Sequence, residues 1–353
     1  MTTIQRRSPE EIRDLRARNP EMRERDFARI HKISEAELVA AHIGHGVTRL
    51  RVDVPAALNG LAACGEVMAL TRNDSAVHEK IGPYENVNLG AHAGTVLGKQ
   101  IDLRVFPNRW AFAFAVEKRT EEGGTRRSLQ FFDSEGTAIH KVHTREATDR
   151  HAWDLLVASL LSDDQSPLLD LSPVTDPGAV DTSAAASQEE LRQSWSKLTD
   201  THQFFGMLKR LNLTRHQALS MIDADYAWPL DLSATRMLLN GAAGTDLPIM
   251  VFIGNHACIQ IHSGPIVKVG EMGPWINIFD ETFHMHLRLD HIAEAWAVRK
   301  PTADGHVTSV ECYGADKQLI VQFFGKRQEG RDERPQWREL VESLPRLEQS
   351  SAA

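Results

Sequence analysis

The sequence has 353 residues, of which 42% are hydrophobic and 25% are charged, and its formal net charge is −8 at pH 7. This composition is typical of a folded globular protein, and the chain is long enough for two domains. The acidic balance argues against a protein that binds the phosphates of nucleic acid. The three cysteines, Cys64, Cys258 and Cys312, form no CxxC pair, and no apolar run is long enough for a signal peptide or a membrane span. We therefore expect a cytoplasmic protein.

The first half of the chain is predicted to begin with two or three helices and to continue with strands. Ser8 and Glu11 have the spacing of a capping box, which opens a helix. Apolar and polar residues then alternate with period two over residues 101–106, 110–118, 127–133 and 137–144. A helix over 147–161 closes this half. Since no strand–helix–strand rhythm occurs, we expect an antiparallel sheet.

A segment rich in Pro, Ser, Asp and Ala follows the first half. Its centre predicts an exposed linker over residues 166–186. This linker divides the chain into a first repeat, residues 1–165, and a second repeat, residues 187–353.

The second half repeats the pattern of the first. Ser187 and Glu190 form the same capping box, and residues 68–87 align without a gap to residues 250–269. Predicted strands cover residues 248–254, 258–263, 283–289, 293–300, 307–314 and 318–325, and a helix covers 334–345. The predicted fold class is α+β, a tandem duplication in which each half is a large antiparallel sheet with flanking helices.

One histidine breaks the symmetry of the duplication. Asp200 and Gln203 predict the start of a helix, and Phe204, Phe205, Leu208 and Leu211 give that helix a buried side. His202 lies in its first turn, and its counterpart in the first repeat falls near Met22. An imidazole beside aromatic residues can bind a metal through one ring nitrogen, and it is the common proximal ligand of haem iron. Drift between the repeats is the alternative.

Other polar residues have weaker patterns. His284 and His286 share one face of a strand, which would suit two ligands of a metal, but no third ligand is near in sequence. His78, His256 and His262 are expected to be structural. Four basic residues lie among apolar neighbours, namely Arg104, Arg215, Lys300 and Arg327. A solvated sheet face explains them, or they border an apolar pocket for a ligand with carboxylates.

Several segments resemble the hemin-degrading factor family, the cytoplasmic hemin transport proteins of Gram-negative haem-uptake systems. Among them are "LGKQIDLRVFPNRWAFAF", "SWSKLTDTHQFFGMLKRLNLTRHQAL" and "LIVQFFGKRQEGRDERPQW". The resemblance covers nearly the whole chain except the linker and the tails. It implies the duplicated antiparallel fold that the repeats predict.

The resemblance also implies a haem site. It makes His202 the axial ligand of the iron of haem b, places Arg104 on the opposite side of the haem with Phe106 nearby, and directs Lys300 at the propionates. The other pocket positions that it implies are Arg215, Phe252, Gln322, Phe323, Phe324 and Arg327.

Two functions are compatible with such a site. The first, which we favour, is a carrier. It would receive imported haem from an ABC transporter and deliver it to a separate haem oxygenase. The alternative is an enzyme that opens the porphyrin ring and releases iron, with Arg104 as the candidate distal residue. We expect no nucleic-acid partner, and the sequence is compatible with a monomer or a dimer.

Overall fold

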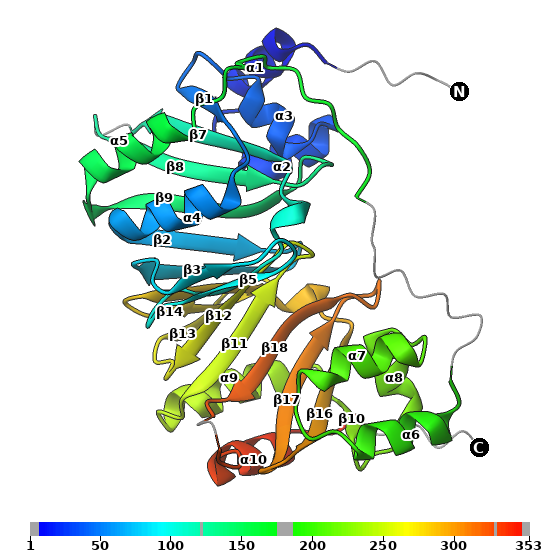
Figure 1. The fold of residues 1–353 in the computed structure, drawn as a ribbon. Helices are drawn as coiled ribbons and strands as arrows, with labels where there is room; N and C mark the ends of the chain where they lie inside the picture. The colour runs from blue at the N-terminus through cyan, green and yellow to red at the C-terminus, as the bar shows by residue number, and fades with distance from the viewer. Residues whose placement is uncertain (1–6, 121–122, 175–185, 328–329, 348–353) are drawn as a thin grey trace. The chain divides into compact units, whose positions relative to one another are not determined.

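The computed structural model describes residues 7–120, 123–174, 186–327 and 330–347. The chain divides into two compact units (Figure 1). Unit 1 consists of Met1–Arg72, Glu79–Thr175 and Gly254–Gln260, and unit 2 consists of Asn73–His78, Asp176–Ile253 and Ile261–Ala353. The described strands make two antiparallel sheets of nine strands each, which confirms the predicted fold class.

The elements of the first repeat begin with three helices. The helices are α1 (Pro9–Ala17), α2 (Glu24–His31), α3 (Glu35–Ala40), α4 (Val54–Ala63) and α5 (Arg150–Ser159). The strands are β1 (Val47–Leu50), β2 (Gly65–Arg72), β3 (Ala76–Gly82), β4 (Val87–Leu89), β5 (Gly94–Leu97), β6 (Asp102–Val105), β7 (Phe112–Arg119), β8 (Thr125–Phe132) and β9 (Ala138–Thr148). Ser8 and Glu11 form the predicted capping box at the start of α1.

Unit 1 has one run of strands in the order β1-β7-β8-β9-β2-β3 and a second in the order β12-β6-β5-β4. Helices α4 and α5 pack against one face of the first run, where Leu58, Trp153 and Leu129 are buried in a common core. Helix α3 covers the other face and packs against Phe114 and Phe132. Strand faces that alternate in this way explain the period-two pattern of the sequence.

The elements of the second repeat follow the same chain order. The helices are α6 (Gln188–Ser196), α7 (Gln203–Arg210), α8 (Arg215–Met221), α9 (Ala234–Gly244) and α10 (Pro335–Glu342). The strands are β10 (Ala227–Leu230), β11 (Ile249–Gly254), β12 (Cys258–Gly264), β13 (Val269–Met272), β14 (Trp275–Phe279), β15 (Phe283–Arg288), β16 (Glu294–Thr302), β17 (Gly305–Tyr313) and β18 (Leu319–Gly325). Three helices, a strand and a helix precede the main strands in both repeats, which confirms the duplication.

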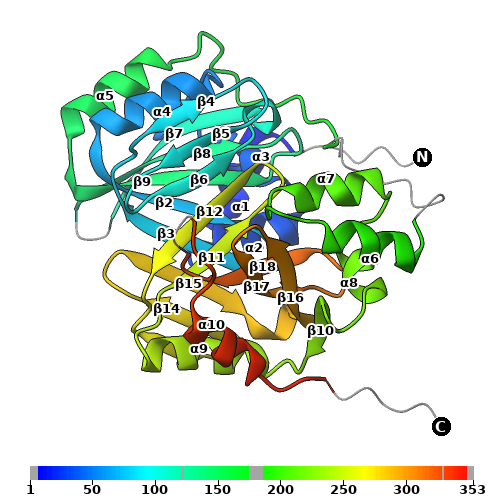
Figure 2. The same ribbon diagram turned by 60° about the horizontal axis from the view of Figure 1, so that its bottom comes forward.

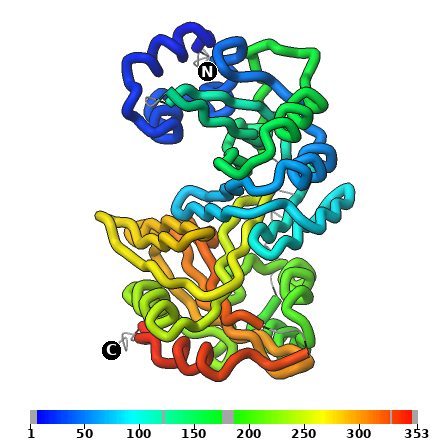
Figure 3. Tube along the Cα trace, turned by 90° about the vertical axis from the view of Figure 1, so that its left-hand side faces the viewer, coloured from blue at the N-terminus to red at the C-terminus, as the bar shows by residue number. Residues whose placement is uncertain are grey.

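Unit 2 has one run of strands in the order β10-β16-β17-β18-β11-β12 and a second in the order β3-β15-β14-β13. Helices α9 and α10 lie side by side against one face of the first run (Figures 2 and 3). Helices α6, α7 and α8 pack on the other face around Trp195 and Phe204 (Figure 1). Each side chain of β16, β17 and β18 therefore faces one of two different helical layers.

Two further predictions concern the ends of elements. Ser187 and Glu190 form the predicted capping box of α6. Residues 175–185 of the predicted linker lie outside the described residues. Among the described helices, none is long and apolar enough to cross a membrane.

Candidate haem site in unit 2

A buried carboxylate organises the helical face of β16, β17 and β18 in unit 2. The Glu311 side chain on β17 is fully buried and accepts six hydrogen bonds from five residues. The donors are Arg215 (2.5 and 2.7 Å), Tyr313 (2.7 Å), Ser309 (2.8 Å), Lys300 (3.1 Å) and Gln322 (3.1 Å). Three residues that the sequence proposed separately, Arg215, Lys300 and Gln322, thus meet at one acceptor.

The charges of this cluster stabilise one another. Burial alone would raise the pKa of Glu311, but the adjacent charges of Arg215 and Lys300 hold it well below its usual value. Burial lowers the pKa of Lys300 to about 8, against the opposing effect of Glu311. At neutral pH the three side chains carry two positive charges and one negative charge, so one positive charge remains uncompensated within the cluster.

Aromatic rings surround the two cations. Phe204 of α7 is buried, with its ring centroid 4.8 Å from Lys300 Nζ and 5.2 Å from Arg215 Cζ. Lys300 Nζ also lies 5.8 Å from the ring of Phe324, and the rings of Phe324 and Phe252 meet edge to face at 5.0 Å. Cations over aromatic faces are stabilised by the ring quadrupole. Phe204 and Phe324 therefore contact the cations bound to Glu311, and Phe252 packs against Phe324.

His202 lies at the start of α7, but the helix begins differently from the prediction. Asp200 is not the N-cap: α7 starts at Gln203, and His202 occupies the N-cap position without capping through its side chain. Instead, one carboxylate oxygen of Asp200 accepts hydrogen bonds from the backbone N–H and from Nδ1 of His202, both at 2.7 Å. The His202 side chain is 93% exposed. Asp200 therefore fixes one ring nitrogen and leaves Nε2 facing outward.

The buried face of α7 is narrower than predicted. Phe204 and Leu208 are buried, but Phe205 is 73% exposed, so its predicted burial is wrong. Adjacent helical residues point about 100° apart, and Phe205 is therefore rotated away from the stripe that Phe204, Met207 and Leu208 form.

Arg327 follows β18 and lies within electrostatic reach of this helix start. The two hydrogen bonds from His202 lower the pKa of Asp200, and the charge of Arg327 adds to the effect. The buried Nε of Arg327 has no hydrogen-bond partner among the described residues. Its guanidinium therefore retains a donor for an anionic ligand.

The other predicted residues take no part in the described contacts of Glu311. Phe323 points to the opposite face of β18 and is buried in the core beneath α9 and α10. Arg104 and Phe106 belong to unit 1, where Arg104 forms an ion pair with Asp102, and Arg109 lies over the Phe106 ring at 5.4 Å.

Three of the other histidines that the sequence singled out have structural contacts. The His262 ring stacks on Phe283 at 4.0 Å, and His78 is buried beside the same ring. His286 Nδ1 lies 2.7 Å from Asn277 Oδ1. In the ranges that the structure describes, no group of three or more His, Cys, Asp or Glu side chains could hold a metal ion.

Neither the role of Glu311 nor the contact of Phe204 with the two cations was predicted from the sequence. The sequence does contain a signal for Glu311. Ser309, Glu311 and Tyr313 alternate with apolar residues and therefore share one face of β17.

The chain resembles known proteins over nearly its whole length. The model of the haemin-degrading HemS/ChuX domain matches it twice, over residues 32–160 and 212–344. The chain is 44% identical to the hemin transport protein HemS of Yersinia enterocolitica, with 95% of this chain and 96% of the relative covered. It is also 44% identical to the hemin transport protein HmuS of Yersinia pestis, with 93% and 94% covered.

Solved structures agree with this match. Holo-PhuS, a haem-binding protein of Pseudomonas aeruginosa, superposes with a TM-score of 0.92 at 44% identity, covering 97% of this chain and all of that chain. ChuS, a haem-degrading enzyme of Escherichia coli O157:H7, superposes with a TM-score of 0.87 at 40% identity, covering 94% and 97%. The protein, with two copies of the domain in one chain, belongs to the haemin-degrading HemS/ChuX family.

Proposed function

We propose that this protein binds haem through unit 2 and carries it in the cytoplasm. The observation that supports this most directly is the geometry of His202. Its Nδ1 is held by Asp200 and its Nε2 faces outward from an almost fully exposed ring. A carboxylate on the second ring nitrogen orients a ligating histidine and raises its basicity. We therefore assign Nε2 of His202 as the axial ligand of the haem iron.

The surroundings suit the rest of the haem molecule. Phe252 and Phe324 supply apolar surface, and the buried cluster of Lys300, Arg215 and Glu311 supplies excess positive charge. Arg327 adds a guanidinium with an unpaired donor. We propose that Lys300 and Arg327 attract the propionates, because cations that are partly removed from water bind carboxylates well. Phe323 is not included in this site.

The family resemblance implies a role for two further residues, Arg104 and Phe106, which belong to unit 1. By family resemblance, Arg104 is assigned to the face of the haem opposite His202, with Phe106 beside it. The ion pair between Arg104 and Asp102 fixes that guanidinium. We propose that the cargo is haem b, received from a haem ABC transporter and delivered to a haem oxygenase.

Ring opening is the second candidate function. It is favoured by the 40% identity to ChuS, which is described as a haem-degrading enzyme. Haem supplies the iron at which oxygen is activated, and Arg104 would donate a hydrogen bond on the distal side.

Titration of the haem-free protein with hemin tests the site. The wild type should give a one-to-one complex with a Soret band shifted from that of free hemin. His202→Ala should change the ferric spectrum and speed haem loss to apomyoglobin. His151→Ala, which removes an exposed histidine of α5, should match the wild type. An unchanged spectrum in His202→Ala would contradict the assignment of the axial ligand.

A second measurement separates the two functions. The haem complex is mixed with ascorbate under air in the presence of catalase. Haem that survives supports the carrier, whereas catalase-independent loss of the Soret band with release of iron supports the enzyme.

A further inference from the structure

Unit 1 carries the same arrangement of strands as the proposed haem site, with different residues. The register gives the correspondence: Val116 pairs with Ser128 on β7 and β8, as Val298 pairs with Ser309 on β16 and β17. Lys118 therefore corresponds to Lys300, two residues after each valine.

The central carboxylate of unit 2 has no equivalent in unit 1. Gln130 pairs with Lys141 on β8 and β9, as Glu311 pairs with Gln322 on β17 and β18. A neutral amide thus stands where unit 2 has its buried counter-ion, and a second lysine stands where unit 2 has a glutamine. The exchange removes one negative charge and adds one positive charge at the same place on the sheet.

This face of unit 1 contains a cavity of about 570 Å³. Its basic lining residues are Lys118, Arg126, Arg127, Lys141 and Arg145, and its acidic ones are Glu24 and Glu79. Arg127 is already paired with Glu117 and Asp154, at 2.9 and 3.0 Å. The other four basic residues outnumber the two carboxylates of the lining.

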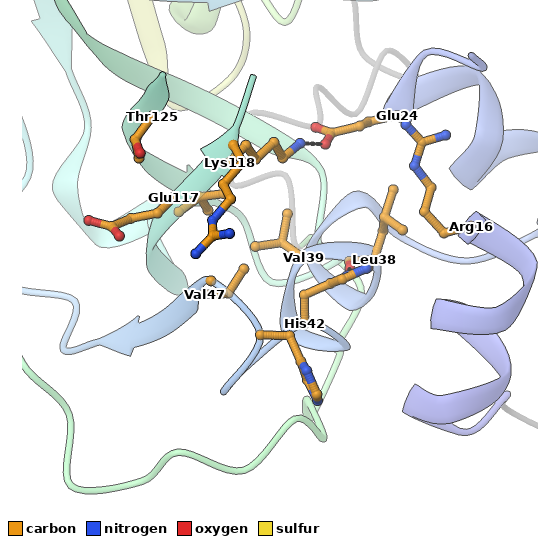
Figure 4. A pocket seen from close by; sticks show the side chains of 13 residues that line it. Arg16, Glu24, Leu38, Val39, His42, Val47, Glu117, Lys118 and Thr125 are labelled. Carbon is orange, nitrogen blue, oxygen red and sulfur yellow. Dashed lines mark hydrogen bonds and ion pairs between the residues drawn. The ribbon is translucent and has the colours of Figure 1, made fainter. Parts of the chain in front are cut away.

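Lys118 and Lys141 both lie near one glutamate, Glu24. Lys118 of β7 extends to Glu24 of α2, as Figure 4 shows from a neighbouring cavity of about 760 Å³ that shares both residues. Lys141, whose side chain is only 12% exposed, lies 3.9 Å from the other oxygen of Glu24. Glu24 therefore faces two ammonium groups. Glu35 also acts on Lys141, but Glu35 already forms an ion pair with Arg72.

The electrostatic environment of His143 reflects this excess of positive charge. Burial, together with the charges of Lys141, Lys118 and Arg126, lowers the pKa of His143 to about 4. Burial also lowers the pKa values of Lys118 and Lys141 to about 8. The charge of Lys141 contributes to the lowering for Lys118, whereas Glu35 opposes the lowering for Lys141.

A buried amide at the cavity is incompletely satisfied. Gln130 is 3% exposed, its Nε2 donates to Ser128 Oγ at 3.1 Å, and its Oε1 has no hydrogen-bond partner among the described residues. Buried polar atoms are normally hydrogen-bonded. Rotation of this amide by 180° would let Oε1 accept from the Ser128 hydroxyl and would direct the NH₂ group to a ligand oxygen.

We propose that this cavity of unit 1 binds a small organic or inorganic polyanion, through Lys118, Lys141 and the amide of Gln130. The ligand class is a molecule with two or more carboxylate or phosphate groups. A second haem fits this lining poorly, because charged side chains dominate it and Met22 stands near the position that corresponds to His202. This proposal is independent of haem binding and goes beyond the proposed function.

Isothermal titration calorimetry on the full, haem-free chain tests the proposal. Pyrophosphate and citrate are the probes, and their relative affinities distinguish a phosphate ligand from a carboxylate ligand. At least one should bind one-to-one. Lys141→Gln, which introduces the residue of unit 2, should weaken binding about ten-fold or more, because it removes a partly desolvated charge contact. Gln130→Glu should abolish binding, because the new carboxylate takes the place of the ligand.

Arg29→Gln is the matched control, since Arg29 is an exposed cation of α2 outside the cavity, and it should bind as the wild type does. Circular dichroism of each variant establishes that it is folded, and Lys141→Gln decides the outcome if Gln130→Glu does not fold. The proposal is overturned if the wild type binds neither probe, or if Lys141→Gln binds like Arg29→Gln.

Discussion

Replacing Glu311 with glutamine should destabilise unit 2 far more than replacing its partner Lys300 with methionine. Glutamine keeps the shape of the side chain but removes the charge that balances Arg215 and Lys300. Removing one partner of a buried ion pair typically costs about 3–5 kcal/mol, because the remaining charge stays buried without compensation. Here two such charges would remain.

The effects of Lys300→Met on the free energy of unfolding should nearly cancel. It leaves Arg215 and Glu311 as a one-to-one pair and removes a lysine whose pKa burial has lowered from 10.5 to about 8. That depression corresponds to an energetic penalty of about 3 kcal/mol at neutral pH. The lost contact with the Phe204 ring, about 2 kcal/mol when desolvated, and a hydrogen bond of about 1 kcal/mol offset the gain. The net change should be close to zero.

Differential scanning calorimetry of the haem-free protein measures the difference. For a unit of this size each kcal/mol shifts the melting temperature by about 2–4 °C, so Glu311→Gln should lower the transition of unit 2 by about 6–20 °C. Lys300→Met should stay within about 3 °C of the wild type. The double variant should recover part of the loss. If Glu311→Gln melts like the wild type, or if Lys300→Met melts as low as Glu311→Gln, Glu311 is not the counter-ion on which the cluster depends.

Three further predictions concern single side chains. Asp200→Asn should weaken haem binding by about ten-fold or more in a hemin titration, because it loosens the anchored ring of His202. Phe204→Ala should cost about 3–5 kcal/mol in urea unfolding, whereas Phe205→Ala should change stability by no more than about 0.5 kcal/mol; equal losses would contradict the observed exposures. Burial lowers the pKa of His140 to about 3, below its value in the unfolded chain. The free energy of unfolding should therefore be highest above about pH 6.5 and should fall as the pH drops toward 3. In urea unfolding between pH 7 and 5, His140→Gln should lose less stability than the wild type does.

Much of the fold was predictable from local pattern. The capping boxes at Ser8 and Ser187 mark true helix starts, and the alternating segments became β6 to β9 in unit 1 and β11, β12 and β15 to β18 in unit 2. Helix α4 was missed because its sequence, VPAALNGLAA, is almost uniformly apolar and has no polar face. Close packing explains why α4 has a glycine at position 60, since a Cβ of Gly60 would lie 2.3 Å from a methyl group of Leu156.

The candidate site was predictable only in part. The asymmetry of the repeats distinguished His202, and the structure places this residue at the start of α7. The ion pair between Arg215 and Glu311 joins residues 96 positions apart on a helix and a strand, and no local pattern connects them. Burial of Phe204 rather than Phe205 depends on the rotation of α7 against β16 and β17, which a hydrophobic pair alone does not specify.

The division of β3 and β12 between the two units has a consequence for synthesis on the ribosome. Unit 1 needs Gly254–Gln260, which are made about 85 residues after its preceding segment ends at Thr175. At typical elongation rates of about 5–20 residues per second, the growing chain waits roughly 4–17 s for them. During that interval the partner strands of β12 in unit 1 have an open edge, and such edges recruit foreign strands. The nascent protein should therefore depend on chaperones most while its second half is being translated.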